Sequence, residues 1–405
     1  MQRISRLLTV TAASAAVVLL AAGCGSSSSG GGGGSSASST ARPNPPAMTA
    51  ATSLGATEGQ LNLIAWAGYA ENGGTDPKVD WVTPFTAATG CKVNVKIGNT
   101  SDEMVTLMKT GQYDGVSASG DASLRLIYGG DVAPVNTDLV PNYATISDFL
   151  KMKPWNSVNG VSYGIPHGWG ANVLAYNPAT VTTAPTSMGV LFDANSPYKG
   201  KISIYDSPTY IADAALYLMR TKPDLKITNP YALDDTQFQA AVDLLKQQRP
   251  LVSSYWADYT HQVSSFDSQE SVLGTSWQVN VNLINADGKV KVNSLVPSEG
   301  ATGWSDTWML AAKAAHPNCM YKWMDWITSP KVNDQVAEWF GEAPAQTKAC
   351  DVATAGFCDQ FHALDAAYAN SIYYWTTPTS NCLDGRGDIC KDYAAWVQAW
   401  TEIKG

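Results

Sequence analysis

The chain has 405 residues, of which 45% are hydrophobic and 15% are charged, a composition typical of a compact globular protein. Its formal charge is −9 at pH 7. An acidic protein is repelled by the phosphate backbone, so the charge argues against nucleic acid as a partner. It suits a protein that collects cations.

The first 23 residues have the pattern of a secretory signal peptide. Arg3 and Arg6 precede an uncharged, mostly apolar run over residues 7–22. The ending Leu-Ala-Ala-Gly-Cys24 resembles a bacterial lipobox, in which cleavage falls before the cysteine and its thiol is joined to diacylglycerol. We therefore expect an extracytoplasmic protein, lipid-anchored to the bacterial cell membrane, with a formal charge of −11 once Arg3 and Arg6 are lost. The alternative is a transmembrane helix, which the short run disfavours.

Residues 24–60 are expected to form a tether between the anchor and the folded domains. Residues 25–40 are almost wholly Ser, Gly and Ala, and residues 41–51 add several prolines. Such sequences bury little apolar surface and form flexible or extended chain. Folded structure should begin near Leu61, which leaves about 345 residues, enough for two domains.

Strands alternate with helices along the folded part, a pattern that predicts parallel sheets covered by helices. Apolar runs and alternation predict strands at residues 60–67, 92–97 and 113–116. Helical spacing and capping residues predict helices at residues 79–89, 101–110, 212–220, 235–248, 318–328 and 331–340.

Seven cysteines divide into Cys24, which would take the lipid, and six others. An even number in an oxidising compartment indicates disulfides. Proximity favours two local pairs and leaves one distant pair: Cys350–Cys358, Cys382–Cys390 and Cys91–Cys319. A zinc site is the alternative, but the sequence has no C-x-x-C pair, so no metal is expected.

Common catalytic motifs are absent from the sequence, which has no P-loop, no H-E-x-x-H and no G-x-S-x-G. The histidines are scattered and number four: His167, His261, His316 and His362. Nothing in this pattern pairs a nucleophile with a base, so we expect neither an enzyme nor a cofactor.

Aromatic residues give the positive signal, since the chain contains 14 Trp and 18 Tyr. Several stand beside loop signals: Trp66, Tyr69, Trp277, Trp304 and Trp375. A single tryptophan usually packs a core. Several at loops, with a carboxylate such as Asp306 nearby, are suited to caging an organic cation.

Five sequence blocks carry a family resemblance through their order and spacing: residues 63–69, 112–119, 163–170, 198–204, and 296–300 followed by 304–306. Together they resemble the spermidine/putrescine-binding component of bacterial ABC importers, a type II periplasmic binding protein, from about Leu61 to Gly341. The resemblance implies an α/β fold of two lobes with the ligand cleft between them. It implies a small organic cation, such as a polyamine, as the ligand. The protein would be a monomer that delivers this ligand to an ABC permease in the membrane.

The resemblance also implies a set of ligand-binding residues: Trp66, Tyr69, Ser119, Trp277, Trp304 and Asp306. In the family the aspartate holds an amine, by a charge-assisted hydrogen bond to the ammonium. It implies lobe 1 over residues 61–168 and 306–345, and lobe 2 over residues 169–305 and 346–405. The crossovers would lie near residues 167–171 and 303–306.

The sequence departs from the family pattern at the far end of the ligand. Asp121 stands where the family has an aromatic residue. Where polyamine binders have two acids for the second amine, this chain has Ser207 and Tyr210, with Asp206 one residue away. Either Asp121 or Asp206 replaces the missing acids, or the ligand carries a single amine.

Other ligands and other classes of function stay open on the sequence. A mono-amine, an amino acid or a quaternary amine would suit the same fold, and Arg125 and Arg220 are candidate partners for a zwitterion's carboxylate. An enzyme built on this scaffold would show turnover of a candidate substrate. A surface interaction protein would have an open cleft without convergent polar groups.

Lipidation is directly testable. We expect the mature chain to begin at Cys24 and to carry acyl chains, because of the lipobox and the tether after it. Mass spectrometry of protein from native membranes would show this, and a free N-terminus at another residue without acyl mass would contradict it.

Overall fold

The computed structural model describes residues 44–405. The predicted signal peptide, Cys24 and most of the predicted tether lie outside the described residues. The last part of the predicted tether packs on the folded chain. Ala51 and Leu54 contact a hydrophobic core, and Glu58 accepts hydrogen bonds from the backbone of Asn318 and Cys319. Among residues 44–405 there is no helix with the length and apolarity needed to cross a bilayer.

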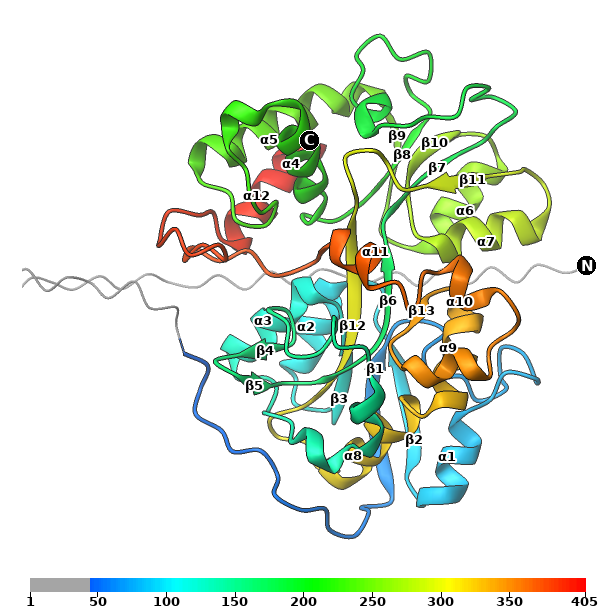
Figure 1. Ribbon diagram of the computed structural model, residues 1–405, viewed down its shortest axis with the longest axis vertical. Coiled ribbons are helices and arrows are strands. Elements are labelled where there is room, and N and C mark those ends of the chain that lie inside the picture. The colour runs from blue at the N-terminus through cyan, green and yellow to red at the C-terminus, as the bar shows by residue number, and fades with distance from the viewer. Residues whose placement is uncertain (1–43) are drawn as a thin grey trace, which may run out of the picture. The chain divides into compact units, whose positions relative to one another are not determined.

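Two mixed sheets organise residues 44–405, one in the lower and one in the upper part of Figure 1. The strands of the first sheet, in spatial order, are β13 (Ala343–Pro344), β6 (Ile165–Ala171), β12 (Thr302–Leu310), β3 (Gly115–Ala118), β1 (Gln60–Ala65) and β2 (Lys92–Ile97), with β14 (Tyr373–Tyr374) beside β12. Strand β1 is parallel to β2 and β3, whereas β12 is antiparallel to β3 and β6.

The second sheet has the same mixture of directions. Its strands, in spatial order, are β11 (Asn293–Leu295), β7 (Val173–Tyr176), β10 (Leu273–Ser276), β8 (Ile202–Tyr205) and β9 (Val252–Trp256). Strand β8 is parallel to β9 and β10, and β7 is antiparallel to β10 and β11. A short hairpin joins β4 (Ser157–Val158) to β5 (Val161–Ser162). The predicted parallel pairing holds for β2, β1 and β3 and for β9, β8 and β10, whereas β6, β7 and β12 next to the crossovers pair antiparallel.

Helices cover both sheets. Those on or beside the first sheet are α1 (Val82–Thr89), α2 (Ser101–Met108), α3 (Gly120–Gly129), α8 (Pro317–Ile327), α9 (Pro330–Phe340), α10 (Phe357–Gln360) and α11 (Ala366–Ser371). Those on the second are α4 (Tyr210–Thr221), α5 (Asp235–Gln248), α6 (Tyr259–Asp267), α7 (Gln278–Asp287) and α12 (Tyr393–Lys404). Each lobe therefore has its own core, with Trp308 and Trp323 fully buried in the first and Trp256 and Trp396 in the second.

The chain passes between the sheets three times within the described residues. It passes at Asn172, between β6 and β7, and again between Leu295 and Thr302. The third passage follows β14, which pairs with β12, and leads to α12 on the second lobe. Residues 169–171 and the start of β12 therefore lie in the first sheet, not in the second lobe as expected. Residues 346–374 also pack with the first lobe, because Ala363 and Ala369 share a core with Trp169.

Several elements match the sequence prediction closely, because their signals are local. Strand β2 and helix α5 have the predicted bounds. Helix α5 begins with a capping box in which the Asp234 carboxylate accepts from the backbone of Gln237, and the Gln237 side chain accepts from the backbone of Asp234. Helix α4 begins at Tyr210, two residues before the predicted start.

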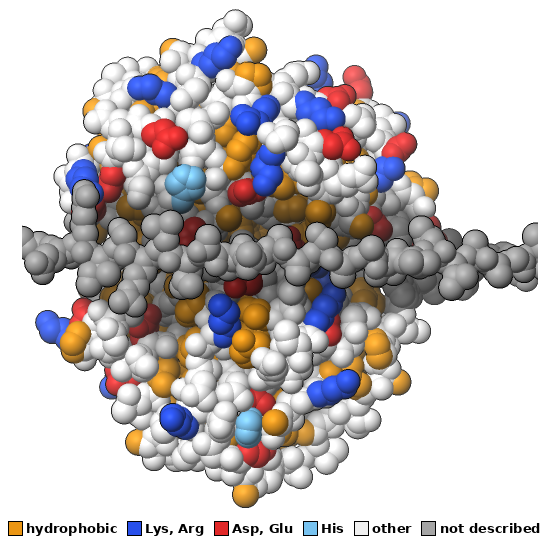
Figure 2. All heavy atoms as spheres, turned by 180° about the vertical axis from the view of Figure 1, so that it is seen from behind, with side chains coloured by type: hydrophobic (Ala, Val, Ile, Leu, Met, Phe, Trp, Pro, Cys, Tyr) orange, Lys and Arg blue, Asp and Glu red, His pale blue; other side chains and the backbone are white. Residues whose placement is uncertain are grey.

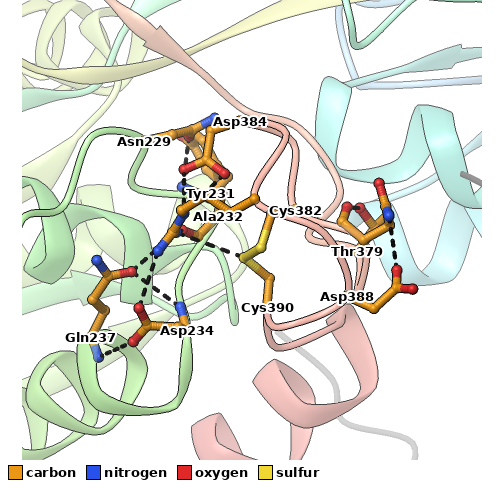
Figure 3. The surroundings of a disulfide bond; sticks show 12 residues. Asn229, Tyr231, Ala232, Asp234, Gln237, Thr379, Cys382, Asp384, Asp388 and Cys390 are labelled. Carbon is orange, nitrogen blue, oxygen red and sulfur yellow. Dashed lines mark hydrogen bonds and ion pairs between the residues drawn. A yellow bond between two sulfur atoms is a disulfide. The ribbon is translucent and has the colours of Figure 1, made fainter. Parts of the chain in front are cut away.

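The described residues contain three disulfides, which have the expected pairing: Cys91–Cys319, Cys350–Cys358 and Cys382–Cys390. Figure 3 shows the surroundings of the Cys382–Cys390 bond. Within this loop, Arg386 donates hydrogen bonds to Asp234, Asp384 and the carbonyl of Ala232. The loop is thereby fixed to the start of α5. Since both sulfurs form the disulfide, the nearby Asp384 has no thiolate with which to hold a metal.

The long disulfide should stabilise the first lobe most. Replacing Cys91 and Cys319 together by Ala is expected to lower the free energy of unfolding by about 2–5 kcal/mol, because the bond joins residues 228 positions apart. Urea denaturation would measure the loss. The control is the Cys382→Ala/Cys390→Ala variant, whose bond closes a separation of only 8. A smaller loss for the long pair than for this control would contradict the expectation.

Candidate functional site

The loops after four parallel strands converge on one cavity of about 380 Å³. Residues 66–75 follow β1, Gly98 and Asn99 follow β2, Ala257 to Tyr259 follow β9, and Trp277 follows β10. The first two loops belong to the first lobe and the last two to the second. Ligands of open α/β sheets bind at the carboxyl ends of strands, so this position marks the cavity as the candidate binding cleft.

Apolar side chains form most of the cavity wall. The ring of Trp66 lies in an edge contact with that of Trp277, with centroids 6.3 Å apart. Three further wall residues are notably exposed for their size: Tyr259 at 40%, Leu283 at 39% and Trp339 at 38%. Among residues 44–405, two acids line the cavity, Glu71 and Asp258, and no Lys or Arg does.

Behind this wall lies a buried cluster of carboxyl and hydroxyl groups. The hydroxyl oxygen of Tyr69 is 2.7 Å from Asp306 Oδ2 and 2.7 Å from Glu342 Oε2. Ser119 Oγ donates to the other oxygen of Asp306 at 2.5 Å. The cluster is formed by four segments: the loop after β1, the start of α3, strand β12 and the turn between α9 and β13. We call it the Asp306 cluster.

A count of hydrogens shows how the Asp306 cluster is protonated. Tyr69 has one hydroxyl hydrogen and cannot donate to two carboxylates at once. The contacts are satisfied when one protonated acid donates to Tyr69 and Tyr69 donates to the other, ionised acid. Because burial raises the pKa of Glu342 more than that of Asp306, Glu342 holds the proton, and Tyr69 and Ser119 donate to ionised Asp306. Burial raises the pKa of Glu342 well above its usual range. Burial also raises the pKa of Asp306, although hydrogen bonds from Ser119 and Tyr69 oppose the shift, and the value reaches about 7.

Within the described residues, neither carboxyl of the Asp306 cluster has a Lys or Arg partner. The nearest basic ring, His167, lies with its centroid 4.5 Å from that of Tyr69. Burial lowers the pKa of His167 to about 3, so it is neutral. The cluster is therefore a buried negative site without a positive counterpart, which is the condition an ammonium ligand would satisfy.

Aromatic rings connect the Asp306 cluster with the second lobe. Phe340 packs against Tyr69 with centroids 4.4 Å apart and against Trp304 at 6.0 Å. On the other side, Trp375 stacks on Tyr205, with centroids 5.6 Å apart and planes at 9°. Trp375 comes from the third passage between the lobes, so the C-terminal part of the chain fills part of the space between them.

The structure separates the other candidate anchors from the cavity. Asp206 accepts from Lys404 Nζ at 2.6 Å and from Trp400 Nε1 at 2.8 Å, both on α12. The hydroxyl of Tyr210 accepts from Gln248 on α5. Asp121 lies buried at the start of α3 with Ser101 donating to it, and burial raises its pKa to about 6. Neither Asp206 nor Asp121 lines the cavity.

The two arginines considered for a zwitterion are engaged elsewhere. Arg125 pairs with Asp102 at 2.6 Å and lies over the ring of Tyr393. Arg220 Nε donates to the carbonyl of Glu299. Neither lines the cavity, so a ligand carboxylate finds no cation there.

Sequence reasoning missed Asp258, Tyr259 and Leu283 in the cavity wall, and also Glu71, Trp339, Phe340 and Glu342. The last three flank Gly341, which ends α9 in the left-handed conformation, at φ 79°. The sequence offered one signal for this site: an acid, Glu342, lies directly after the glycine that ends α9 and directly before the short strand β13. The close contact also depends on Gly168, since a Cβ there would lie 2.2 Å from the Glu342 carboxylate.

The known proteins to which this chain is similar include solute-binding proteins. Residues 80–357 match the bacterial extracellular solute-binding protein family. The chain is 25% identical over 261 residues to the spermidine/putrescine-binding periplasmic protein of Escherichia coli K12, covering 64% of this chain and 71% of that protein. It is 24% identical to the putrescine-binding periplasmic protein SpuD of Pseudomonas aeruginosa, covering 64% and 72%.

Solved structures share the fold at low identity. A putative spermidine/putrescine ABC transporter protein from Listeria monocytogenes superposes with a TM-score of 0.70 at 17% identity, covering 86% of this chain and 99% of that one. MotA from A. tumefaciens B6, solved with glucopine, has a TM-score of 0.66 at 18% identity, covering 85% and 100%. Because the family match spans more than half of the chain, this protein belongs to the bacterial extracellular solute-binding protein family and has its two-lobe fold.

Proposed function

We propose that this protein captures a small organic cation of the amine class outside the cytoplasm and delivers it to an ABC permease. The observation that carries the proposal is the Asp306 cluster, a buried carboxyl pair that no Lys or Arg of residues 44–405 neutralises. An ammonium has three donors and one charge, so it complements ionised Asp306. The ring of Phe340, which packs against Tyr69, and that of Trp304, which packs against Phe340, favour a cation further.

The relatives support an amine as the ligand, and the acids of the second lobe bear on how many ammonium groups are held. Those of E. coli and P. aeruginosa are named as binding spermidine and putrescine, or putrescine. A diamine held at both ends needs a second acid in the other lobe. Of the acids in that lobe, Asp206 is paired with Lys404, and Asp258 in the cavity wall is exposed and accepts from Thr260. We therefore propose one firmly held ammonium and weak discrimination for a second.

Ligand binding would be coupled to hinge closure. Tyr69 and Asp306 are almost fully buried, so an amine reaches them only when the lobes separate. Trp66 belongs to the first lobe and Trp277 to the second, and their rings meet across the cleft. An amine that contacts both lobes binds the closed state better and shifts the equilibrium toward it.

The remaining parts of the proposal concern location and partners. Cys24 would anchor the protein in the membrane next to the permease. The protein would act as a monomer, with one copy for each captured ligand, and would catalyse no reaction. On the parts of the described surface that Figure 2 leaves uncovered, positive and negative side chains are interspersed, unlike the clustered basic residues of a nucleic-acid-binding surface.

Asp306 can be tested against its neighbour. Asp306→Asn is expected to weaken amine binding by about ten- to a hundredfold, since a charge-assisted hydrogen bond contributes about 1.5–3 kcal/mol. Glu342→Gln is the matched control, because the amide donates to Tyr69 as the protonated acid does. Titration calorimetry with putrescine and butylamine would measure both variants. Equal losses in the two variants would contradict the assigned protonation, and unchanged binding in Asp306→Asn would remove the anchor.

The affinity for amines should rise with pH. The raised pKa of Asp306, about 7, means that the carboxyl becomes protonated and neutral as the pH falls through this value. An aliphatic amine stays charged throughout, because its pKa is near that of Lys, about 10.4. Binding is therefore expected to be weak near pH 5 and strong near pH 8, whereas Asp306→Asn shows little dependence. A flat wild-type profile in calorimetry would contradict this coupling.

A further inference from the structure

The cavity at the ends of β1, β2, β9 and β10 differs chemically from the Asp306 cluster behind it. We propose that it takes an amine with a single ammonium and an aromatic or branched apolar body, with the ammonium at Glu71. This inference rests on the proposed capture of an amine and narrows the class of amine. It assigns the single ammonium to Glu71 in place of Asp306, and the two acids are alternatives that the variants distinguish. We call the space the Glu71 cavity.

The apolar body is assigned from the cavity wall. Leu283 and Trp277 come from α7 and its N-terminal flank, and Trp339 and Phe340 form the end of α9. Leu283 and Trp339 leave more than a third of their surfaces exposed. Large apolar side chains gathered around a concave space, rather than scattered singly, indicate a surface that a ligand covers.

The charge is assigned from the acids. Glu71 lies half-buried in the wall, and none of the hydrogen bonds or ion pairs found among residues 44–405 involves its carboxylate. Asp258 is exposed, and one of its oxygens already accepts from the backbone and hydroxyl of Thr260 at the start of α6. With no Lys or Arg in the wall, Glu71 is the acid placed to hold a cation.

A linear polyamine fits this cavity poorly. Its ammonium groups recur along the chain. Asp258 is exposed and already accepts from Thr260, so the groups beyond the first would lie against Leu283 or Val279. A charge transferred from water to such a surface without a partner costs free energy. An aromatic or branched body places apolar surface there instead, and one ammonium is enough for Glu71.

The test compares an aromatic amine with two linear polyamines and with its own neutral analogue. Wild-type protein would be titrated calorimetrically with 2-phenylethylamine, putrescine, spermidine and 2-phenylethanol, the neutral analogue. We expect phenylethylamine to bind at least about tenfold more tightly than the alcohol, as the loss of a charged hydrogen bond implies. It should also bind more tightly than either polyamine, whose further ammonium groups lose water without gaining a partner. Tighter binding of putrescine or spermidine than of phenylethylamine would overturn the inference and leave the proposed function in place.

Variants separate the Glu71 cavity from the Asp306 cluster. Glu71→Gln and Leu283→Ala should each weaken phenylethylamine binding severalfold or more. Their controls are Glu270→Gln, an exposed acid elsewhere, and Val397→Ala, a side chain 38% exposed on α12. Loss of binding in Asp306→Asn, with no change in Glu71→Gln and Leu283→Ala, would overturn the inference while supporting the proposed function. Loss in the two cavity variants with none in Asp306→Asn would support the cavity and remove the Asp306 anchor. A wild-type protein that binds no amine would overturn both.

Discussion

The contact on which the site depends is the sharing of one Tyr69 hydroxyl by two buried carboxyl groups. Asp306 and Glu342 come from segments far apart in the chain, and both lie at 2.7 Å from the same oxygen. A buried polar group without a partner costs free energy, so strand β12, the end of α9 and the loop after β1 must keep a fixed relation to one another. The lack of a side chain at Gly168 is part of that constraint. The cluster thus contributes to lobe structure as well as to the site.

The C-terminal part of the chain determines what the second lobe can offer. After β14 the chain places Trp375 on Tyr205, and Thr377 donates to the carbonyl of Asp121. A Cβ at Gly120 would lie 1.8 Å from the Trp375 carbonyl, so this close passage requires glycine. Helix α12 then supplies Lys404, which neutralises Asp206. Helix α12 thus completes the core of the second lobe and also pairs with Asp206, so this acid is not available to a ligand.

Local signals in the sequence predicted several elements, such as β2 and α5, and the two disulfides between neighbouring cysteines. The contact of Tyr69 and Ser119 with Asp306 joins three residues that the family resemblance had implied. Glu342 could not be predicted in this way, because its role depends on tertiary contact between the end of α9 and β12. Asp206 was misleading for the same reason, since its partner lies 198 positions away in sequence. The lobe boundaries implied by the family resemblance differ from those in the structure, because β6 and β12 continue in the first sheet beyond the expected crossovers.

The distribution of charge between the lobes bears on how an amine would close the cleft. Asp306 and Glu71 belong to the first lobe, whereas the second lobe contributes mostly apolar side chains, Trp277, Leu283 and Tyr259, with the exposed Asp258 beside them. An amine would therefore be held electrostatically by one lobe and covered by the apolar surface of the other. Contact with an apolar surface is not directional and depends on the shape and size of the ligand. In such an arrangement, the first lobe would select for positive charge, and the second would discriminate among amines by the form of their uncharged part.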